Sequence, residues 1–274
     1  MKCQKFFIFS LQFPGFVLYY GLYGVYRMTT EDYLYLEQVD STNQYVRDHF
    51  DDLPDGCLVA AKTQTAGRGR LGRQWLSPPE ENIYATWVIK QLTEPYLATA
   101  AGSLAVLETL REYAPDVTFF LKWPNDVYAD HAKICGILTE GVTGTGNTLK
   151  GAAVGIGINI NSKAETFAGL PPAASLASLT GNVFFVKNVI SALVKRLSAC
   201  YITYLYAPDV LFTRWKTENR LIGRELEFQP ASGEPFRAVF RDVLRTGEAL
   251  LETETGVQSF SCGDVRILKE SIHI

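Results

Sequence analysis

Three apolar stretches between residues 117 and 161 follow one another with turn signals and no room for a helix between them. They are VTFFLKWPNDVY (117–128), KICGILTEG (133–141) and LKGAAVGIGININ (149–161), and the turn TGTGN separates the last two. Strands joined by such short links pair antiparallel, because a parallel pair needs a crossover of a dozen or more residues. The succession therefore predicts an α+β fold rather than alternating β–α–β units.

Further elements are indicated on both sides of this succession. A helix is expected to begin near Ser41, because Gln44 lies three residues on and completes a capping-box pattern. Pro95 is expected to open a helix that runs to about Tyr113. Periodicity and composition indicate strands at 56–65 and 83–90, helical structure over 184–219, and a small all-β unit from Leu221 onward.

The bulk composition is that of an ordinary globular protein, and its charge narrows the function classes. Of 274 residues, 47% are hydrophobic and 20% are charged, and the net charge is −3 at pH 7. A mildly acidic chain is a poor match for non-specific nucleic-acid binding, which needs a basic surface. The five cysteines are widely spaced without a C-x-x-C motif, which argues against a disulfide framework or a zinc site. A reduced, cytoplasmic compartment fits this pattern best. Cys135 lies in an apolar run and is expected to be a core residue rather than a nucleophile.

An apolar stretch near the N-terminus is open to three interpretations. Residues 6–26 carry no charge, and Lys2 and Lys5 precede them as in a signal peptide. Pro14 and several glycines and tyrosines weaken a membrane interpretation. The stretch is therefore an extension upstream of a working start at Met28, a structured arm, or a membrane or export signal. The first interpretation is preferred, and no membrane partner is expected.

The stretch TAGRGRLGRQW, residues 65–75, literally matches the dinucleotide-binding pattern G-x-G-x-x-G. In that kind of site the glycine loop opens a helix whose N-terminus holds the pyrophosphate. Here Pro78 and Pro79 follow closely, and two prolines exclude a long helix that starts in this window. The pattern also lacks the G-K-[ST] ending of a P-loop. The three arginines are the distinctive part, since arginine grips phosphate oxygens bidentately, and a solvated basic loop is the alternative.

The motif KWPND, residues 122–126, joins a lysine, a rigid turn and a carboxylate. Asp126 could hold Mg²⁺ through one oxygen while the metal keeps waters and takes phosphate oxygens. Lys122 could screen the same phosphates. The alternative is a β-turn in which proline, asparagine and aspartate serve the turn geometry alone.

Two further features lie on the strands that follow. Lys133 heads an apolar strand, where it is either a cation for a substrate carboxylate or a strand-end lysine that reaches water. In GIGIN, Gly155 and Gly157 would let something flat approach the sheet. Asn159 then offers both hydrogen-bond donors and an acceptor.

Taken in order, the motifs DSTNQ, TQTAGRGRLGRQW, KWPND, K-x-x-G-I-L and GIGIN resemble those of the biotin protein ligases. The resemblance covers about residues 37–270, and the arginine–glycine run together with Lys-Trp-Pro-Asn-Asp is highly specific to that family. It implies a mixed, largely antiparallel central sheet flanked by helices, related to the class II aminoacyl-tRNA synthetases. It also implies a catalytic domain over 29–220 and an SH3-like β-barrel over 221–274, after an apolar extension at 1–28.

The resemblance implies an enzyme that makes biotinyl-5′-AMP from biotin and ATP with Mg²⁺, and then transfers biotin to one lysine of a biotin carboxyl carrier domain. The arginine loop would close over the acyl-adenylate and exclude water. The catalytic residues would be the cations Arg70, Lys133, Arg68 and Lys122, and the Mg²⁺ ligand would be Asp126. The residues bordering the substrates would be Ser41, Thr42, Asn43, Gln64, Gly67, Arg68, Gly69, Arg70, Arg73, Trp75, Lys133, Gly136, Gly157 and Asn159.

Within these, the resemblance implies more specific contacts. The small polar groups from Ser41 to Asn43 would border the neutral ureido head of biotin, which has both N–H donors and a carbonyl acceptor. Trp75 would form an apolar wall or a stacking face, and Asn159 would meet the adenine.

Some members of the family carry an N-terminal winged-helix domain and act as repressors. The segment before VDSTN is too short and too apolar for one, so a ligase without repressor function and without nucleic-acid binding is expected. The family includes homodimers, and that state stays open. Two other functions also remain open: a lipoate or octanoate ligase or transferase of the same fold, and a non-enzymatic regulator that binds biotin.

Overall fold

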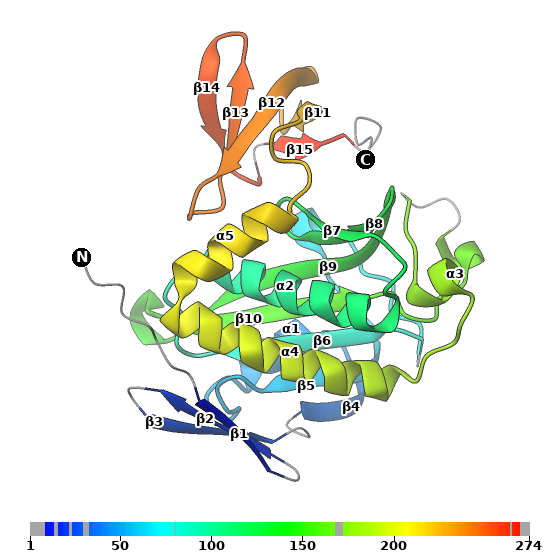
Figure 1. Cartoon of the computed structure of the whole chain (residues 1–274), viewed down its shortest axis with the longest axis vertical. Helices are drawn as coiled ribbons and strands as arrows, with labels where there is room; N and C mark the ends of the chain where they lie inside the picture. The colour runs from blue at the N-terminus through cyan, green and yellow to red at the C-terminus, as the bar shows by residue number, and fades with distance from the viewer. Residues whose placement is uncertain are drawn as a thin grey trace.

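A computed structural model describes residues 33–79, 81–167, 172–263 and 265–268, together with the backbone of three strands nearer the N-terminus. A seven-stranded sheet runs through the centre in the order β4-β5-β6-β10-β9-β8-β7 (Figure 1). Only the β4–β5 pair is parallel among these neighbours, which confirms the mixed, largely antiparallel sheet. The strands are β4 (Tyr33–Val39), β5 (Leu58–Gln64), β6 (Ile83–Ile89), β7 (Phe119–Lys122), β8 (Asp126–Ala129), β9 (Ala132–Thr143) and β10 (Leu149–Ile158).

The long helices pack together on one face of this sheet, and a short helix packs on the other. In Figure 1, α2 (Pro95–Tyr113) and α4 (Val186–Tyr206) lie across the sheet, and α5 (Pro208–Glu218) continues from α4. The helical region expected over 184–219 is confirmed, and it consists of two helices because the chain leaves the helical conformation at Ala207 and Pro208 opens a new helix. The short helix α1 (Thr42–Asp48) contacts β5, β6 and β10, and α3 (Leu176–Thr180) follows the central sheet.

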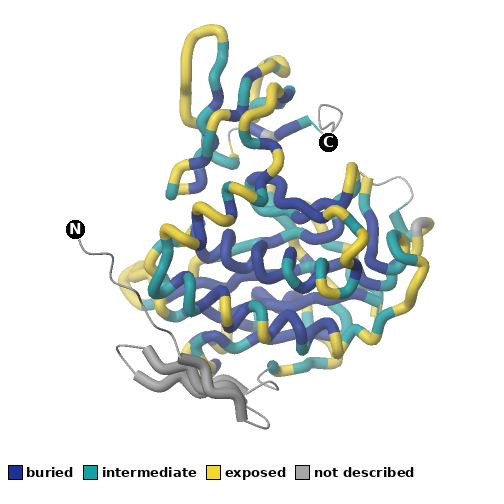
Figure 2. Tube along the Cα trace, in the orientation of Figure 1, coloured by how far each residue is buried: buried dark blue, intermediate teal, exposed yellow. Residues whose placement is uncertain are grey.

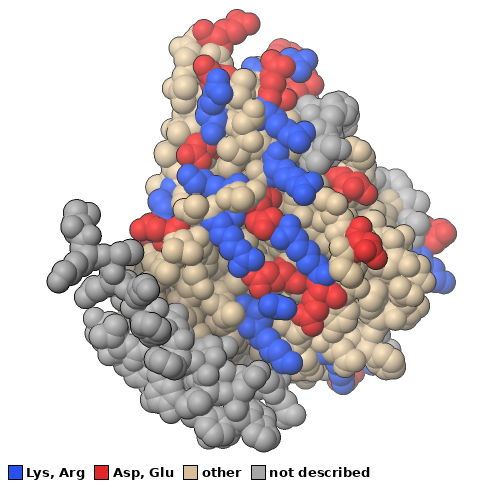
Figure 3. Space-filling model, viewed as in Figure 1, with Lys and Arg blue, Asp and Glu red and all other residues tan. Residues whose placement is uncertain are grey.

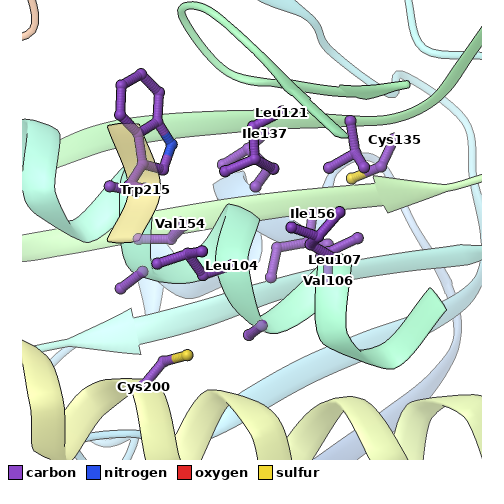
Figure 4. Packing of buried hydrophobic residues seen from close by; sticks show 14 of the residues in the cluster. Leu104, Val106, Leu107, Leu121, Cys135, Ile137, Val154, Ile156, Cys200 and Trp215 are labelled. Atoms are coloured by element: carbon purple, nitrogen blue, oxygen red, sulfur yellow. The ribbon is translucent and has the colours of Figure 1, made fainter. Parts of the chain in front are cut away.

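Strand alternation separates an apolar face from a face that can hold a site. Val154 and Ile156 of β10 point toward Leu104 and Leu107 of α2, in a cluster that is fully enclosed (Figure 4). The tube in Figure 2 shows this layer as an almost continuous buried region. The glycines between those apolar residues face the opposite side, where they leave the backbone uncovered by side chains of their own.

The outer surface of the helices α4 and α5 carries both signs of charge side by side, as Figure 3 shows. Arg196 pairs with Glu108 and Glu112, and Arg214 also pairs with Glu108. These pairs are half-exposed, so each contributes little to stability.

A second sheet, in the order β14-β13-β12-β11-β15, follows α5 and stands beyond one end of the main body (Figure 1). Its all-β character was expected from residue 221 onward and is confirmed. The expected closed barrel is wrong, because the edge strands β14 and β15 do not pair within the described residues and the sheet stays open. The strands are β11 (Glu225–Pro230), β12 (Phe236–Val243), β13 (Ala249–Thr253), β14 (Gly256–Phe260) and β15 (Val265–Ile267).

The hairpin turn between β12 and β13 anchors this sheet to the main body. The indole Nε1 of Trp123 donates to the carbonyl oxygen of Gly247 over 2.9 Å, and both groups are separated by more than a hundred residues in sequence. The ring of Tyr96 lies directly below Gly247, where an added Cβ would be 2.3 Å from it. Arg245 pairs with Glu94, at the start of α2. The Trp-Pro turn of the KWPND motif is thus held from behind by the C-terminal sheet.

The described backbone of the apolar N-terminal stretch forms strands. Strands β1 (Phe9–Phe13), β2 (Phe16–Gly21) and β3 (Gly24–Thr29) pair antiparallel in a small separate sheet. Among the described residues, no helix has the length and apolar character needed to cross a membrane. The domain boundaries at 28 and 220 stay predictions.

Candidate functional site

A pocket of about 1270 Å³ lies over the glycine-bearing face of the central sheet. The arginine loop borders it on one side, and residues of β11 and of the chain around β15 border it on another. The pocket brings together every residue that the sequence placed in the site except Gly67. An added Cβ at Gly67 would be 2.6 Å from the carbonyl oxygen of Trp75, so this glycine serves the close turn of the loop.

The floor of the pocket is a pair of glycines covered by an indole ring. Gly136 of β9 and Gly157 of β10 are register partners, and a Cβ on either would meet Trp75. At Gly157 that Cβ would be 2.5 Å from Cε2 of the ring, and at Gly136 it would be 3.0 Å from Cζ3. The expectation that a flat group approaches the sheet at GIGIN is confirmed, and at Gly157 that group is the side chain of Trp75. The Nε1 of this indole is buried and has no hydrogen-bond partner within the described residues.

Lys133 and Asp126 form an ion pair beside this indole. Their Nζ and Oδ1 atoms are 2.5 Å apart, and both side chains are mostly buried. The same ammonium group lies 5.5 Å from the centre of the Trp75 ring. An added Cβ at Gly136 would be 2.8 Å from this nitrogen, so the glycine also admits the lysine to the floor. The lysine therefore enters the pocket rather than reaching away into water.

The arginine loop contains only a short 3-10 turn, Arg70–Gly72. It opens no long helix, which confirms that the dinucleotide pattern is misleading here. Arg70 crosses the pocket and donates through Nη1 to Oδ1 of Asn125 over 3.1 Å, and through Nη2 to the carbonyl oxygen of Cys262 over 2.5 Å. Arg68 donates to Oε1 of Gln44 on α1. The loop is thus pinned to the KWPND turn, to the C-terminal sheet and to α1.

Lys122 is the most enclosed cation of the pocket, with 7% of its surface exposed. Its Nζ lies 5.4 Å from the centre of the Tyr128 ring. Burial raises the pKa of Tyr128, with the nearby carboxylate of Asp126 adding to the effect, so its hydroxyl keeps its proton. Burial likewise raises the pKa of Cys135, and this fully buried thiol is a core residue, as the sequence predicted.

The polar end of the pocket lies at the start of α1. The backbone N–H of Thr42 donates to Oε1 of Gln64 over 2.9 Å, and Nε2 of Gln64 donates to the hydroxyl of Ser77. Ser41 occupies the N-cap position, as predicted. The capping box is wrong, because the Ser41 side chain makes no cap hydrogen bond and Gln44 donates to Asp48 instead. Ser41 is buried and lines the pocket.

Asn43 and Asn159 line the pocket, but protein groups already engage much of their hydrogen-bonding capacity. Nδ2 of Asn43 donates to the carbonyl oxygen of Leu138 and to the Glu140 carboxylate. Nδ2 of Asn159 donates to the carbonyl oxygen of Ala174, which ties the strand end to the segment that follows it. Both amides therefore shape the pocket wall, whatever else they contact.

One carboxylate, that of Asp126, lines the pocket among the residues that the structure describes. The described chain contains no group of three histidine, cysteine or acidic side chains that could hold a metal by itself. Mg²⁺ is commonly bound through one or two carboxylates together with substrate phosphates, so a single aspartate among cations fits a metal that arrives with a nucleotide.

The sequence indicated the cations and glycines of the pocket but missed the residues that hold them in place. Asn125 was interpreted only as a turn residue. Its side chain in fact accepts a hydrogen bond from Arg70 and donates one to the carbonyl oxygen of Ile137. Thr86 and Glu140 gave no signal, since neither belongs to a motif. The carbonyl oxygen of Cys262 reaches Arg70 across 192 positions of sequence, a proximity that no local pattern could indicate.

The chain is similar to known proteins in sequence and in fold. The profile of the biotin/lipoate A/B protein ligase family matches residues 35–159. The bifunctional ligase/repressor BirA of Escherichia coli is 28% identical over 239 residues, which cover 85% of this chain and 73% of BirA. The biotin–[acetyl-CoA-carboxylase] ligase of Paracoccus denitrificans is 28% identical and is covered over 98% of its length, with 84% of this chain. The biotin protein ligase of Aquifex aeolicus in complex with biotin and ATP superposes with a TM-score of 0.72 at 26% identity, over 87% of this chain and 99% of that one.

Proposed function

Because the chain belongs to the biotin/lipoate A/B protein ligase family, we propose that it is an ATP-dependent biotin protein ligase. In the first step a biotin carboxylate oxygen attacks the α-phosphorus of ATP, and pyrophosphate leaves with biotinyl-5′-AMP as the other product. In the second step a lysine amine of a carrier protein attacks the acyl carbon and AMP leaves. The observation that carries the proposal is the convergence of five cations on one pocket of a chain whose net charge is −3: Arg68, Arg70, Arg73, Lys122 and Lys133.

The first step joins two anions, so positive charge is its main requirement. A carboxylate oxygen must come within about 3–3.5 Å of the phosphorus, and without cations this approach is repelled. Arg70 and Lys133 are proposed to lie nearest the reacting atoms. Both are already held in place by protein partners, so little reorganisation opposes the reaction. No protein nucleophile is required.

The single pocket carboxylate has two proposed roles. Asp126 orients the Lys133 ammonium, and with its second oxygen it would hold Mg²⁺ that arrives with ATP. The metal would supply neutralisation of the phosphate charge. Lys122, enclosed beside the same turn, is proposed to screen the phosphates as well.

The remaining lining residues are proposed to position the two substrates. The polar groups of Ser41, Thr42 and Gln64 would meet the ureido head of biotin, beside the indole that covers Gly136 and Gly157. Trp75 would form an apolar wall beside the ligand. Asn159 would meet the adenine through the part of its amide that Ala174 leaves free.

The arginine loop is proposed to retain the adenylate until the carrier arrives. Gly69 lines the pocket and lets the loop approach the ligand closely, and Arg68 and Arg70 on either side of it would face the phosphate. Closing the loop excludes water, which matters because an acyl-adenylate hydrolyses readily. The acceptor is proposed to be the biotin carboxyl carrier domain of a carboxylase, and the reaction is proposed to take place in the cytoplasm.

The decisive experiment is mass spectrometry of the purified protein after incubation with ATP, Mg²⁺ and either biotin or lipoate. Biotinyl-AMP, released pyrophosphate and a biotinylated carrier lysine are expected. Lipoyl-AMP without biotinyl-AMP would replace the proposal with a lipoate ligase. Tight biotin binding without ATP-dependent pyrophosphate would instead indicate a non-enzymatic regulator.

Arg70→Ala tests the retention step of the same proposal. The variant loses the contacts to Asn125 and Cys262 that hold the loop over the pocket, so activated biotin should escape into solution. Escape is measured as indiscriminate labelling of a bystander protein added to the assay. A variant that makes and holds biotinyl-AMP as the wild type does would contradict the role of Arg70.

A further inference from the structure

The amide of Asn43 has only one orientation that its surroundings allow. Its Nδ2 lies 3.1 Å from the carbonyl oxygen of Leu138 and 2.7 Å from Oε2 of Glu140, and both of these are acceptors. The nitrogen must therefore face them, which turns Oδ1 the other way. The amide lies against Gly155, where an added Cβ would be only 2.3 Å from Oδ1.

The orientation of Asn43 determines the direction of the next hydrogen bond. Oδ1 has no hydrogen, so the hydroxyl of Thr86, 2.6 Å away, must donate to it. Thr86 lies on β6, opposite Gly155 in the sheet register, and is fully buried. Its single hydroxyl hydrogen is then engaged, and the oxygen keeps only lone pairs for its other neighbour.

That other neighbour is Thr42, whose hydroxyl oxygen lies 2.8 Å from that of Thr86 and 3.2 Å from Oε1 of Gln64. The Gln64 oxygen is identified as an acceptor because it also receives the backbone N–H of Thr42. The hydroxyl hydrogen of Thr42 thus faces two acceptors of the protein. Toward the pocket, which Thr42 lines, its oxygen can offer only lone pairs.

We propose that Thr86 is a positioning residue that sets the hydrogen-bond polarity at the polar end of the pocket. In this way it selects acids whose ring carries an N–H donor. The inference rests on the proposed function. Thr86 does not itself line the pocket, and it acts through Thr42 and Asn43. A cyclic urea satisfies the Thr42 oxygen with an N–H group. The dithiolane ring of lipoate carries no donor and would leave that oxygen buried and unsatisfied, which is strongly unfavourable.

The test compares Thr86→Val, which keeps the branched shape but removes the hydroxyl, with Thr86→Ser, which keeps the hydroxyl. In Thr86→Val, the Asn43 oxygen loses its donor and Thr42 loses the nearer of its acceptors. The side chains of Thr42 and Asn43 are then no longer held in one arrangement. We expect the KM for biotin to rise about tenfold in pyrophosphate release, as unsatisfied buried groups commonly cause. The KM for ATP should stay close to that of the wild type, and Thr86→Ser should restore the biotin value.

A second substrate tests whether the effect belongs to the urea or to the sulfur-containing ring of biotin. Desthiobiotin keeps the cyclic urea, so its KM should rise in Thr86→Val by about the same factor as that of biotin. If Thr86→Val does not fold, Thr86→Ala removes the same hydroxyl without the added methyl contacts and should show the same split. An unchanged biotin KM, or equal rises for biotin and ATP, would overturn the inference. A wild-type protein without biotin-dependent pyrophosphate release would instead refute the proposed function itself, and the inference with it.

Discussion

Gly157 is the position where one added methyl group would disturb the pocket most directly. Its Cβ would lie 2.5, 2.7 and 2.8 Å from three adjoining atoms of the Trp75 indole. Non-bonded carbon atoms are normally no closer than about 3.5 Å, so in Gly157→Ala the ring must move away by about 1 Å. Because the three atoms belong to one rigid ring, no rotation of a flexible chain end can relieve the overlap.

The size of the effect follows from this overlap. Overpacking of this kind costs about 1–3 kcal/mol, which lowers the population of the docked indole by about 5-fold to 150-fold. The ring also moves away from the Lys133 ammonium and weakens a cation–π contact that is now 5.5 Å long. If the docked ring is part of the substrate site, the KM for biotin should rise by a factor in that range.

The measurement is biotin-dependent pyrophosphate release at saturating ATP. The matched control is Gly141→Ala, on the neighbouring strand β9, whose Cβ would meet only the end of the Leu149 side chain. The control should leave the KM for biotin unchanged, and urea unfolding of both variants should confirm that they fold. A normal KM for biotin in folded Gly157→Ala would show that the indole over Gly157 has no part in binding.

Three further outcomes follow from particular contacts. Gly155→Ala should displace the Asn43 amide, 2.3 Å from the new Cβ, and raise the KM for biotin more than that for ATP in the same assay. Tyr201→Phe should lower the free energy of unfolding in urea by about 1.5–3 kcal/mol, because the Tyr201 hydroxyl donates to the Asp55 carboxylate over 2.8 Å. Hydrogen bonds from Arg111 lower the pKa of Glu218. Its contribution to the stability of the fold is therefore present above the ordinary pKa of 4.5 and is lost as the pH falls below that value. Thermal unfolding should therefore show Glu218→Gln less stable than the wild type at neutral pH by under about 1 kcal/mol, with the difference shrinking in acid; a constant difference would contradict the pairing.

Local patterns predicted most of the elements because those patterns are short in range. The helix from Pro95 to Tyr113 has the expected bounds, since proline opens it and apolar periodicity continues to its end. The strands at β5, β6, β9 and β10 also lie where β-branched and apolar runs placed them. The region expected to be helical over 184–219 is divided at Pro208, and a proline inside a helical pattern is itself a local signal for such a break.

The cations and glycines of the pocket were likewise predictable, but their partners were not. A run of arginines among glycines indicates an anion site from composition alone, whatever the rest of the chain does. Arg70 is held by Asn125 and by the carbonyl oxygen of Cys262, which lies between β14 and β15 and is 192 positions away in sequence. The open edge of that sheet was equally beyond local patterns, because strand closure depends on twist and register between distant strands.

By itself, the sequence determined the α+β class, the succession of most strands along the chain, and the residue types that could neutralise two substrate anions. These follow from backbone propensity and from charge, which act over a few residues or none. Only the tertiary structure decided that Trp75 lies on Gly157 and that Thr86 directs its hydrogen toward Asn43. Hydrogen-bond polarity and close contact depend on which atoms meet across the sheet, and side chains far apart in sequence meet there only when the chain has folded.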